Sequence, residues 1–293
     1  MIGPFSYLQI KPTPSIIKNH YQWVLKCVVS LAIGFYLYQV LEDKFYQPVS
    51  WPENSPATWW MILWVLILMP VNWLLEAQKW QFILGQERIS LPNSLKQVLR
   101  GLALNWILPF TSGDIVARMG DFTEPAKKSK AILYNRLSSL LITLVFGLIG
   151  IAGYLHFHKE VITFTFYVHL PFFLLILISP LFFLGSTGKY VFSITLLRYL
   201  VFSLQFYVLI SLFLPFLSFS IIFSGIAWIF LIRSVLPGIL GAIGIREASA
   251  VFYFSYWIQD PLLIITPALL LWTINIVIPS IAGTLSLALS KSA

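Results

Sequence analysis

The chain has 293 residues, of which 58% are hydrophobic and 10% are charged. A soluble domain carries about 25% charged residues, so this composition excludes an ordinary soluble protein and is typical of a membrane protein with several spans. The formal net charge of +8 does not indicate nucleic-acid binding, because the lysines gather in short loops between apolar runs.

Six full transmembrane helices are predicted along the chain. Several of the apolar runs reach the roughly 20 residues that a helix needs to cross a bilayer. The predicted spans are 22–41, 58–84, 129–155, 161–185, 190–215 and 260–288. The first run is too long for a secretory signal and has no small-residue cleavage site, so we expect it to be retained as a helix.

Basic residues in the loops orient these spans. Cytoplasmic loops of membrane proteins carry an excess of lysine and arginine. Lysines flank the first and the last span on the sides nearest the two ends of the chain: Lys11, Lys18, Lys26 and Lys291. Both termini are therefore expected on the cytoplasmic side of the membrane.

Two further apolar stretches, about 94–121 and 219–258, are each interrupted near the middle by proline and glycine. Basic loops flank the first stretch on both sides, so it should enter and leave on the cytoplasmic side, and the second should do so on the outer side. Both are predicted to be re-entrant helical hairpins. Two pairs of short spans would give the same orientation, and this alternative stays open.

The two interrupted stretches share the motif L-P-x3-G-x4-R. It reads "LPFTSGDIVAR" from Leu108 and "LPGILGAIGIR" from Leu236, with a constant offset of 128 (237 − 109). Each half has two spans, a hairpin and a third span, and an odd number of crossings inverts the second half. We therefore expect an all-α membrane protein with an inverted repeat, residues 1–157 and 158–293. The predicted helix breaks are Pro109, Gly113, Pro237, Gly238, Gly241 and Gly244.

Charged residues lie in or beside the broken helices, where each is costly in hydrocarbon. The helix that restarts after a break directs its positive end towards an anion, and arginine adds a fork that suits phosphate oxygens. The candidate substrate-binding residues are Arg118, Arg246, Asp114, Glu247 and Arg136. Asp114 could pair with Arg118, and Glu247 with an arginine of the other hairpin. The alternatives are that these charges only lock the hairpins together and that Arg136 reaches the cytoplasmic surface.

Other chemistry has no support in the sequence. Cys27 is the single cysteine, and the four histidines show no spacing of metal ligands. No HExxH or GxSxG motif is present, so we expect no enzyme activity, no cofactor and no metal. Arg198 and Arg233 belong to no motif and are expected at the membrane surface.

The second motif resembles the signature of the flippase-like transmembrane family of lysylphosphatidylglycerol synthases, in which proline and small residues precede Gly-x-Gly-x-Arg-Glu-Ala. "LNWILPFTSGDIVAR" resembles that family's first motif, Asn-x3-Pro-x3-Gly-[Asp/Glu]-x3-Arg, which adds Asn105 to the candidate site. "NWLLEAQKWQFIL" from Asn72 resembles the end of its second span. The resemblance implies a bacterial or archaeal cytoplasmic-membrane protein that moves or binds lipid.

The chain departs from the family at two places. The family usually opens its third span with Glu-Arg-x2-Asp, whereas this chain has "NRLSS" from Asn135, and the last span lacks an arginine near "LLWTINIVIPS". We expect a flippase or headgroup transporter for an anionic, aminoacylated or glycosylated lipid, without the soluble synthase domain. The alternative is a non-transporting membrane partner of a lipid-modifying enzyme such as a glycosyltransferase. The lipid, the coupling of transport and the oligomeric state stay open.

Overall fold

A computed structural model describes residues 14–44, 48, 50–85, 89–106, 108, 112–119, 125–158, 169–171, 173–175, 185–236 and 244–290. The side chains of residues 14–23, 25, 26, 125–128 and 290 lie outside this description. Within these ranges the chain forms helices and no strand, so the expected all-α class is confirmed for the described residues.

Four helical segments are long and apolar enough to cross a membrane, as far as the described residues go. They are α2 (Pro56–Leu84), α5 (Pro125–Phe157), α7 (Ser186–Phe213), and the continuous run of α10 (Pro261–Trp272), the π-helical turn η5 (Thr273–Val277) and α11 (Ile278–Ser290). They coincide with four of the six predicted spans. The predicted span 22–41 falls within α1 (Pro14–Leu41), which a short 3₁₀ turn, η1 (Glu42–Lys44), follows, and most of 161–185 lies outside the described residues.

Two of the long helices, α2 and α10, begin at a side-chain cap. Ser55 precedes α2 and its hydroxyl accepts a hydrogen bond from Thr58 N at 3.2 Å, while Asp260 accepts one from Leu262 N at 3.1 Å at the start of α10. Both caps are followed by proline, whose fixed φ suits the first helical turn. The sequence thus sets where these apolar helices begin.

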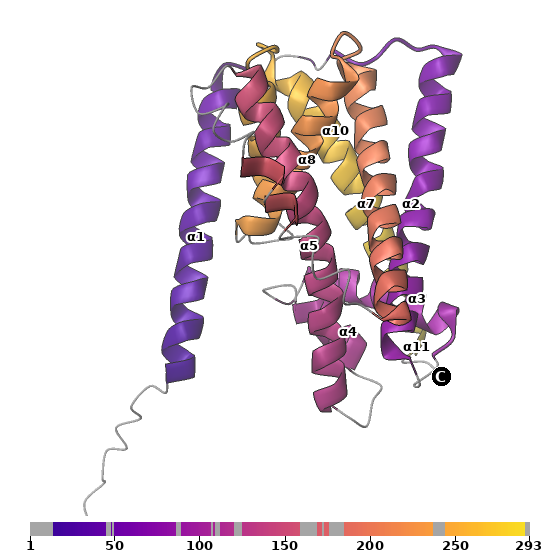
Figure 1. Cartoon of the computed structure of the whole chain (residues 1–293). Helices are drawn as coiled ribbons and strands as arrows, with labels where there is room; N and C mark the ends of the chain where they lie inside the picture. Colours follow the sequence, from indigo (N-terminus) through magenta and orange to yellow (C-terminus); the bar gives the residue numbers. More distant parts are fainter. Residues whose placement is uncertain are drawn as a thin grey trace, which may run out of the picture.

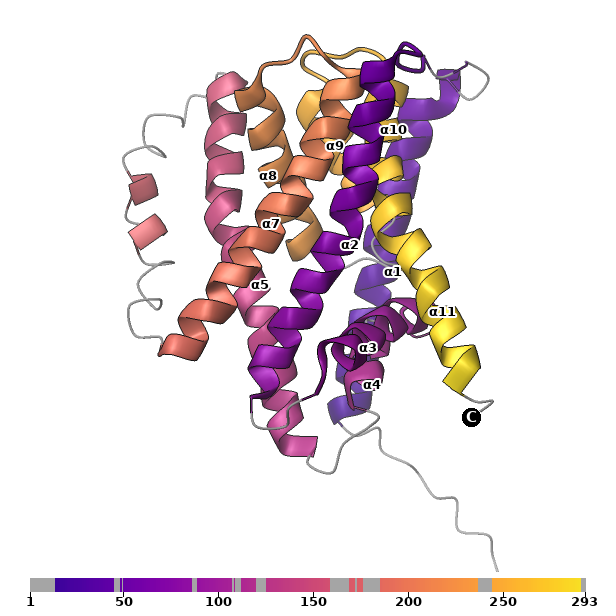
Figure 2. The same cartoon turned by 90° about the vertical axis from the view of Figure 1, so that its right-hand side faces the viewer.

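Both interrupted stretches fold as broken pairs of helices. The first consists of α3 (Leu91–Leu104) and α4 (Ser112–Met119), and the second of α8 (Phe219–Val235) and α9 (Ile245–Phe254). Neither is one unbroken helix, as expected. The two pairs lie towards opposite ends of the bundle, and α1 begins at the end where α11 finishes (Figures 1 and 2). The predicted break residues Pro109, Pro237, Gly238 and Gly241 lie outside the described residues.

Glycine allows the closest approaches within the broken pairs. A Cβ at Gly113 would lie 2.4 Å from the backbone N of Asn105, and one at Gly101 would lie 2.9 Å from Asp114 Cα, so α4 folds back against α3. Gly244 precedes α9 with φ +88°, a left-handed conformation that glycine adopts without strain. These two predicted break positions, Gly113 and Gly244, therefore have structural reasons to be glycine.

The two halves of the chain meet along α5 and α8. A Cβ at Gly150 would lie 2.4 Å from Trp228 N, and one at Gly153 would lie 2.3 Å from Ser224 Cβ. Small residues allow membrane helices to pack backbone to backbone in this way. The larger hydrophobic core lies beside this contact and includes Phe206, Phe230 and Tyr253 from α7, α8 and α9.

A buried charged cluster as the candidate functional site

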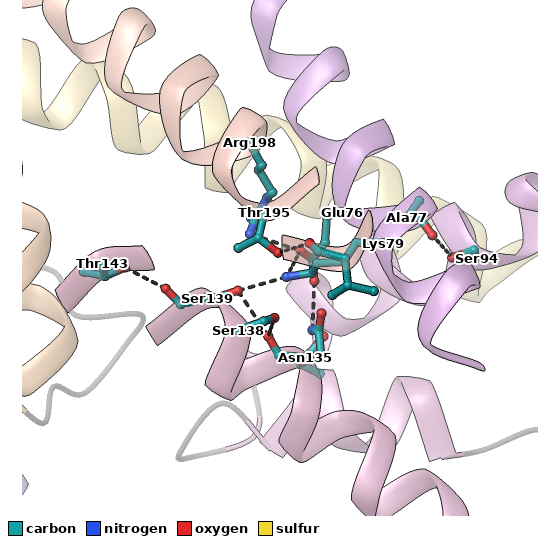
Figure 3. Close-up of polar contacts among 12 residues, drawn as sticks. Glu76, Ala77, Lys79, Ser94, Asn135, Ser138, Ser139, Thr143, Thr195 and Arg198 are labelled. Carbon is teal, nitrogen blue, oxygen red and sulfur yellow. Dashed lines mark hydrogen bonds and ion pairs between the residues drawn. The ribbon is translucent and has the colours of Figure 1, made fainter. Parts of the chain in front are cut away.

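Glu76, near the end of α2, is the centre of a buried network and is only 4% exposed. Its Oε1 accepts hydrogen bonds from Arg118 Nη2 at 2.9 Å and Asn135 Nδ2 at 3.1 Å. Its Oε2 lies 3.1 Å from Lys79 Nζ and 3.0 Å from Arg198 Nη1. Figure 3 shows the side chains from α2, α5 and α7 converging on this carboxylate. One buried carboxylate therefore holds three cations.

Arg118 of α4 is 2% exposed and is fixed on several sides. Its Nε donates to Asp114 Oδ1 at 2.7 Å, so the expected pair four residues apart is present. Its guanidinium lies 4.6 Å from the ring centroid of Trp80, whose Nε1 donates to Gln97 at 2.8 Å. The motif arginine of the first broken pair thus belongs to the Glu76 network.

Lys79 contacts Glu76 from the same helix, α2, and Arg198 contacts it from α7. Lys79 is fully buried and also donates to Ser139 Oγ of α5 at 2.9 Å. Arg198 of α7 lies over the ring of Trp73, 5.4 Å from its centroid. Arg198, which was expected at the membrane surface, pairs with Glu76 and so links the two halves of the chain.

Arg246 and Glu247 of α9 form a second group. Arg246 is 1% exposed, and its Nη1 lies 3.4 Å from the backbone oxygen of Ala268. Glu247 Oε2 accepts from Gly244 N at 2.8 Å, which closes the first turn of α9. The charge of Glu247 also acts on Arg246 and on the half-buried Arg233 of α8, and Arg233 is within electrostatic range of Arg198. The second group is therefore coupled to the first through the like charges of Arg233 and Arg198.

The two groups together make what we call the charged cluster. Its five cations are Lys79, Arg118, Arg198, Arg233 and Arg246, and its three carboxylates are Glu76, Asp114 and Glu247. The described side chains thus carry two more positive than negative charges (5 − 3). Four buried guanidinium nitrogens have no hydrogen-bond partner among the described residues: Arg118 Nη1, Arg198 Nε, Arg233 Nε and Arg246 Nε. Buried cations with unused donors favour an anion.

Three further predicted site residues have the following surroundings in the structure. Asn105 ends α3, and its Oδ1 accepts from Asp114 N at 3.1 Å, so it holds α4 in place. Arg136 is exposed on α5, next in sequence to Asn135. Glu247 binds the start of its own helix α9 rather than an arginine of the other hairpin. The described contacts do not join Arg118 and Arg246: Arg118 binds Glu76 and Asp114, whereas Arg246 contacts the backbone oxygen of Ala268.

Sequence reasoning missed Glu76, the residue with the most partners in the cluster. The sequence does contain an indication of its importance. Glu76 lies three residues before a lysine inside an apolar run, and ionisable residues within a membrane span usually have a function. Arg198 and Arg233 carry the same signal as isolated arginines in apolar runs. Their partners come from other helices, which no local motif identifies.

Two further observations bear on the identity of the chain. Among the described residues, no group of histidine, cysteine and carboxylate side chains could hold a metal ion. A scan of protein-family models gives no match, and no curated protein matches significantly in sequence. The charged cluster is therefore the main indication of what this protein does.

Proposed function

We propose that this chain is a membrane protein that binds an anionic lipid headgroup at the charged cluster and moves the lipid between leaflets. The observation that carries the proposal is the set of buried arginine nitrogens without a hydrogen-bond partner among the described residues, placed among helices long enough to span a bilayer. Arginine presents a planar fork that binds two phosphate oxygens at once. A lipid phosphate would supply the missing negative charge.

The proposed architecture has six spans and two re-entrant hairpins related by inversion. It is supported by two broken helix pairs towards opposite ends of the bundle. The cluster draws side chains from both halves, with Glu76 and Arg118 from the first and Arg198 and Arg246 from the second. Transporters with inverted repeats bind their substrates where the repeats meet.

The resemblance to the flippase-like family agrees with lipid movement in a cytoplasmic membrane but does not identify the lipid. The chain has Asn135 and Ser139 where that family has carboxylates. These side chains contact Glu76 and Lys79, so both departures lie at the cluster itself. The headgroup is therefore better inferred from the chemistry of the cluster than from the family.

Leaflet exchange in liposomes tests the proposal. Purified protein should accelerate the movement of fluorescent phosphatidylglycerol between leaflets, measured by dithionite quenching. Arg246→Ala and Arg246→Lys should both weaken lipid binding by roughly 10- to 150-fold, the loss of one charged hydrogen bond. Arg100→Ala is the matched control, because Arg100 binds Ser286 outside the cluster.

Three outcomes distinguish the alternatives. Exchange no faster than in protein-free liposomes, with binding retained, would indicate the non-transporting membrane partner. Lipid binding by Arg246→Ala equal to that of the wild-type protein would contradict the assigned site. Thermal unfolding of the same variant separates lost binding from lost folding, since a purely structural arginine would lower stability and leave binding by the folded protein intact.

A further inference from the structure

The contacts around Glu76 have the form of an anion-binding site that a side chain of the protein itself occupies. Four nitrogen donors converge on its carboxylate: Arg118 Nη2 and Asn135 Nδ2 lie 2.9 and 3.1 Å from Oε1, and Arg198 Nη1 and Lys79 Nζ lie 3.0 and 3.1 Å from Oε2. They come from α4, α5, α7 and α2 itself. Charged donors around two oxygens are also what a phosphate group binds.

The carboxylate leaves part of this donor set unused. Glu76 Oε2 has no hydrogen-bond partner among the described residues, although Lys79 and Arg198 lie within ion-pair distance of it. Arg118 Nη1 and Arg198 Nε belong to the two guanidinium groups that contact Glu76, and both are buried without a described partner. A phosphate group has more oxygen atoms than a carboxylate, so it can accept from donors that Glu76 leaves free.

Arg198 is the part of this site that a headgroup would reach first. Its side chain is 26% exposed, compared with 6% for that of Glu76 and 3% for that of Arg118. Glu76 and Lys79 are three residues apart on α2, so their contact does not depend on α7. A phosphate that binds Arg198 would therefore replace Glu76 at that partner and leave Glu76 with Lys79.

We infer that Glu76 and the lipid phosphate compete for Arg198, so that Glu76 is the counter-ion of the site before a lipid binds and promotes release afterwards. This inference rests on the proposed function, because it takes the competing anion to be the phosphate of a lipid headgroup. Buried cations without an anion are costly, so a site without Glu76 would hold its lipid more tightly. Conduction through a membrane needs binding that is strong enough for entry and weak enough for exit. Glu76 therefore sets the affinity for the lipid without binding it.

The test measures the binding of dioleoyl phosphatidylglycerol to the full chain in nanodiscs of otherwise zwitterionic lipid. Glu76→Gln keeps the shape of the side chain and frees Arg198, so this variant should bind the lipid at least about tenfold more tightly than the wild-type protein, the equivalent of one charged hydrogen bond. The lipid should also dissociate more slowly, because affinity differences between related complexes lie mostly in that rate. Glu42→Gln removes the same charge from an exposed turn and should bind as the wild-type protein does.

Replacing Arg198 shows whether the gain arises at this site. Arg198→Gln should weaken binding, and adding Glu76→Gln to it should give much less than a tenfold gain, because the two anions no longer share that partner. If Glu76→Gln alone fails to fold, Glu76→Gln with Lys79→Met is compared with Lys79→Met alone, since this pair leaves no unpaired lysine in the fully buried position. The same gain in affinity is expected there.

Thermal unfolding separates this role from a purely structural one. A ligand that binds only the folded state raises its stability, and it does so more as its affinity increases. Phosphatidylglycerol should therefore raise the melting temperature of Glu76→Gln by more than that of the wild-type protein. A carboxylate that only holds the helices together would leave the two increases equal.

Each outcome supports or overturns the inference. Lipid binding by folded Glu76→Gln that is no tighter than that of the wild-type protein would overturn it and leave the proposed function intact. A full gain that persists without Arg198 would also overturn it, because the competition would then lie elsewhere. Binding of the lipid by neither protein would overturn the proposed function itself. Inorganic phosphate binding as tightly as the lipid would replace the headgroup with a soluble anion, against the proposed function.

Discussion

Glu76 is expected to be the most sensitive single position for stability. Glu76→Gln keeps the size of the side chain and removes the charge that lies within 3.1 Å of Lys79, Arg118 and Arg198. Lys79 would then have no described carboxylate within ion-pair distance. Removing one partner of a buried ion pair costs about 3–5 kcal/mol. The ratio of folded to unfolded protein should thus fall by roughly 150- to 5,000-fold.

Reversible unfolding in mixed micelles, with SDS as denaturant and helical circular dichroism as the signal, measures this change in free energy. Glu42→Gln is the matched control, because Glu42 is exposed on the turn after α1 and should change stability by about 0.5 kcal/mol or less. Adding Lys79→Met to Glu76→Gln removes a stranded cation and should recover part of the loss. A Glu76→Gln protein as stable as Glu42→Gln would refute the central role of Glu76.

Three further predictions concern packing, hydrogen bonding and topology. Gly113→Ala should destabilise the protein by about 1–3 kcal/mol, because its Cβ would meet the backbone of α3, whereas Gly34→Ala, with nothing within 4 Å, should not; thermal unfolding compares them. Tyr253→Phe and Ser224→Ala should be non-additive by about 1 kcal/mol in a double-mutant cycle, because the two hydroxyls bond each other at 2.5 Å; additive losses would argue against this bond. In a Cys27→Ser background, an impermeant maleimide should label Glu53→Cys from outside but label Lys130→Cys only after permeabilisation; external labelling of Lys130→Cys would invert the proposed orientation.

The sequence was sufficient to predict the elements whose causes are local. An apolar run of sufficient length gives a membrane-spanning helix, and four predicted spans coincide with helices that meet this criterion. Each of the two interrupted stretches combines proline with glycine near its middle, so both breaks could be located. The pair of Asp114 and Arg118 follows from their spacing of four residues on one helix.

The remaining contacts of the site could not be predicted, because they depend on how distant helices pack. Nothing in the stretch around Glu76 shows that α4, α5 and α7 each bring a donor to it. Compared with the resembled family, Asn135 and Ser139 each replace a carboxylate with an uncharged side chain. In the structure an amide at 135 donates to Glu76, where a second carboxylate would repel it.

The ion pair between Glu76 and Arg198 indicates how binding and movement could be coupled in the proposed transporter. Glu76 keeps Lys79 and Arg118 from its own half of the chain, whereas Arg198 belongs to the other half. An anion that binds Arg198 competes with Glu76 for it and so weakens a contact between the halves. The halves also meet along α5 and α8, where glycine brings the backbones together. A bound headgroup would therefore favour a conformation in which the Glu76 side of the cluster is open.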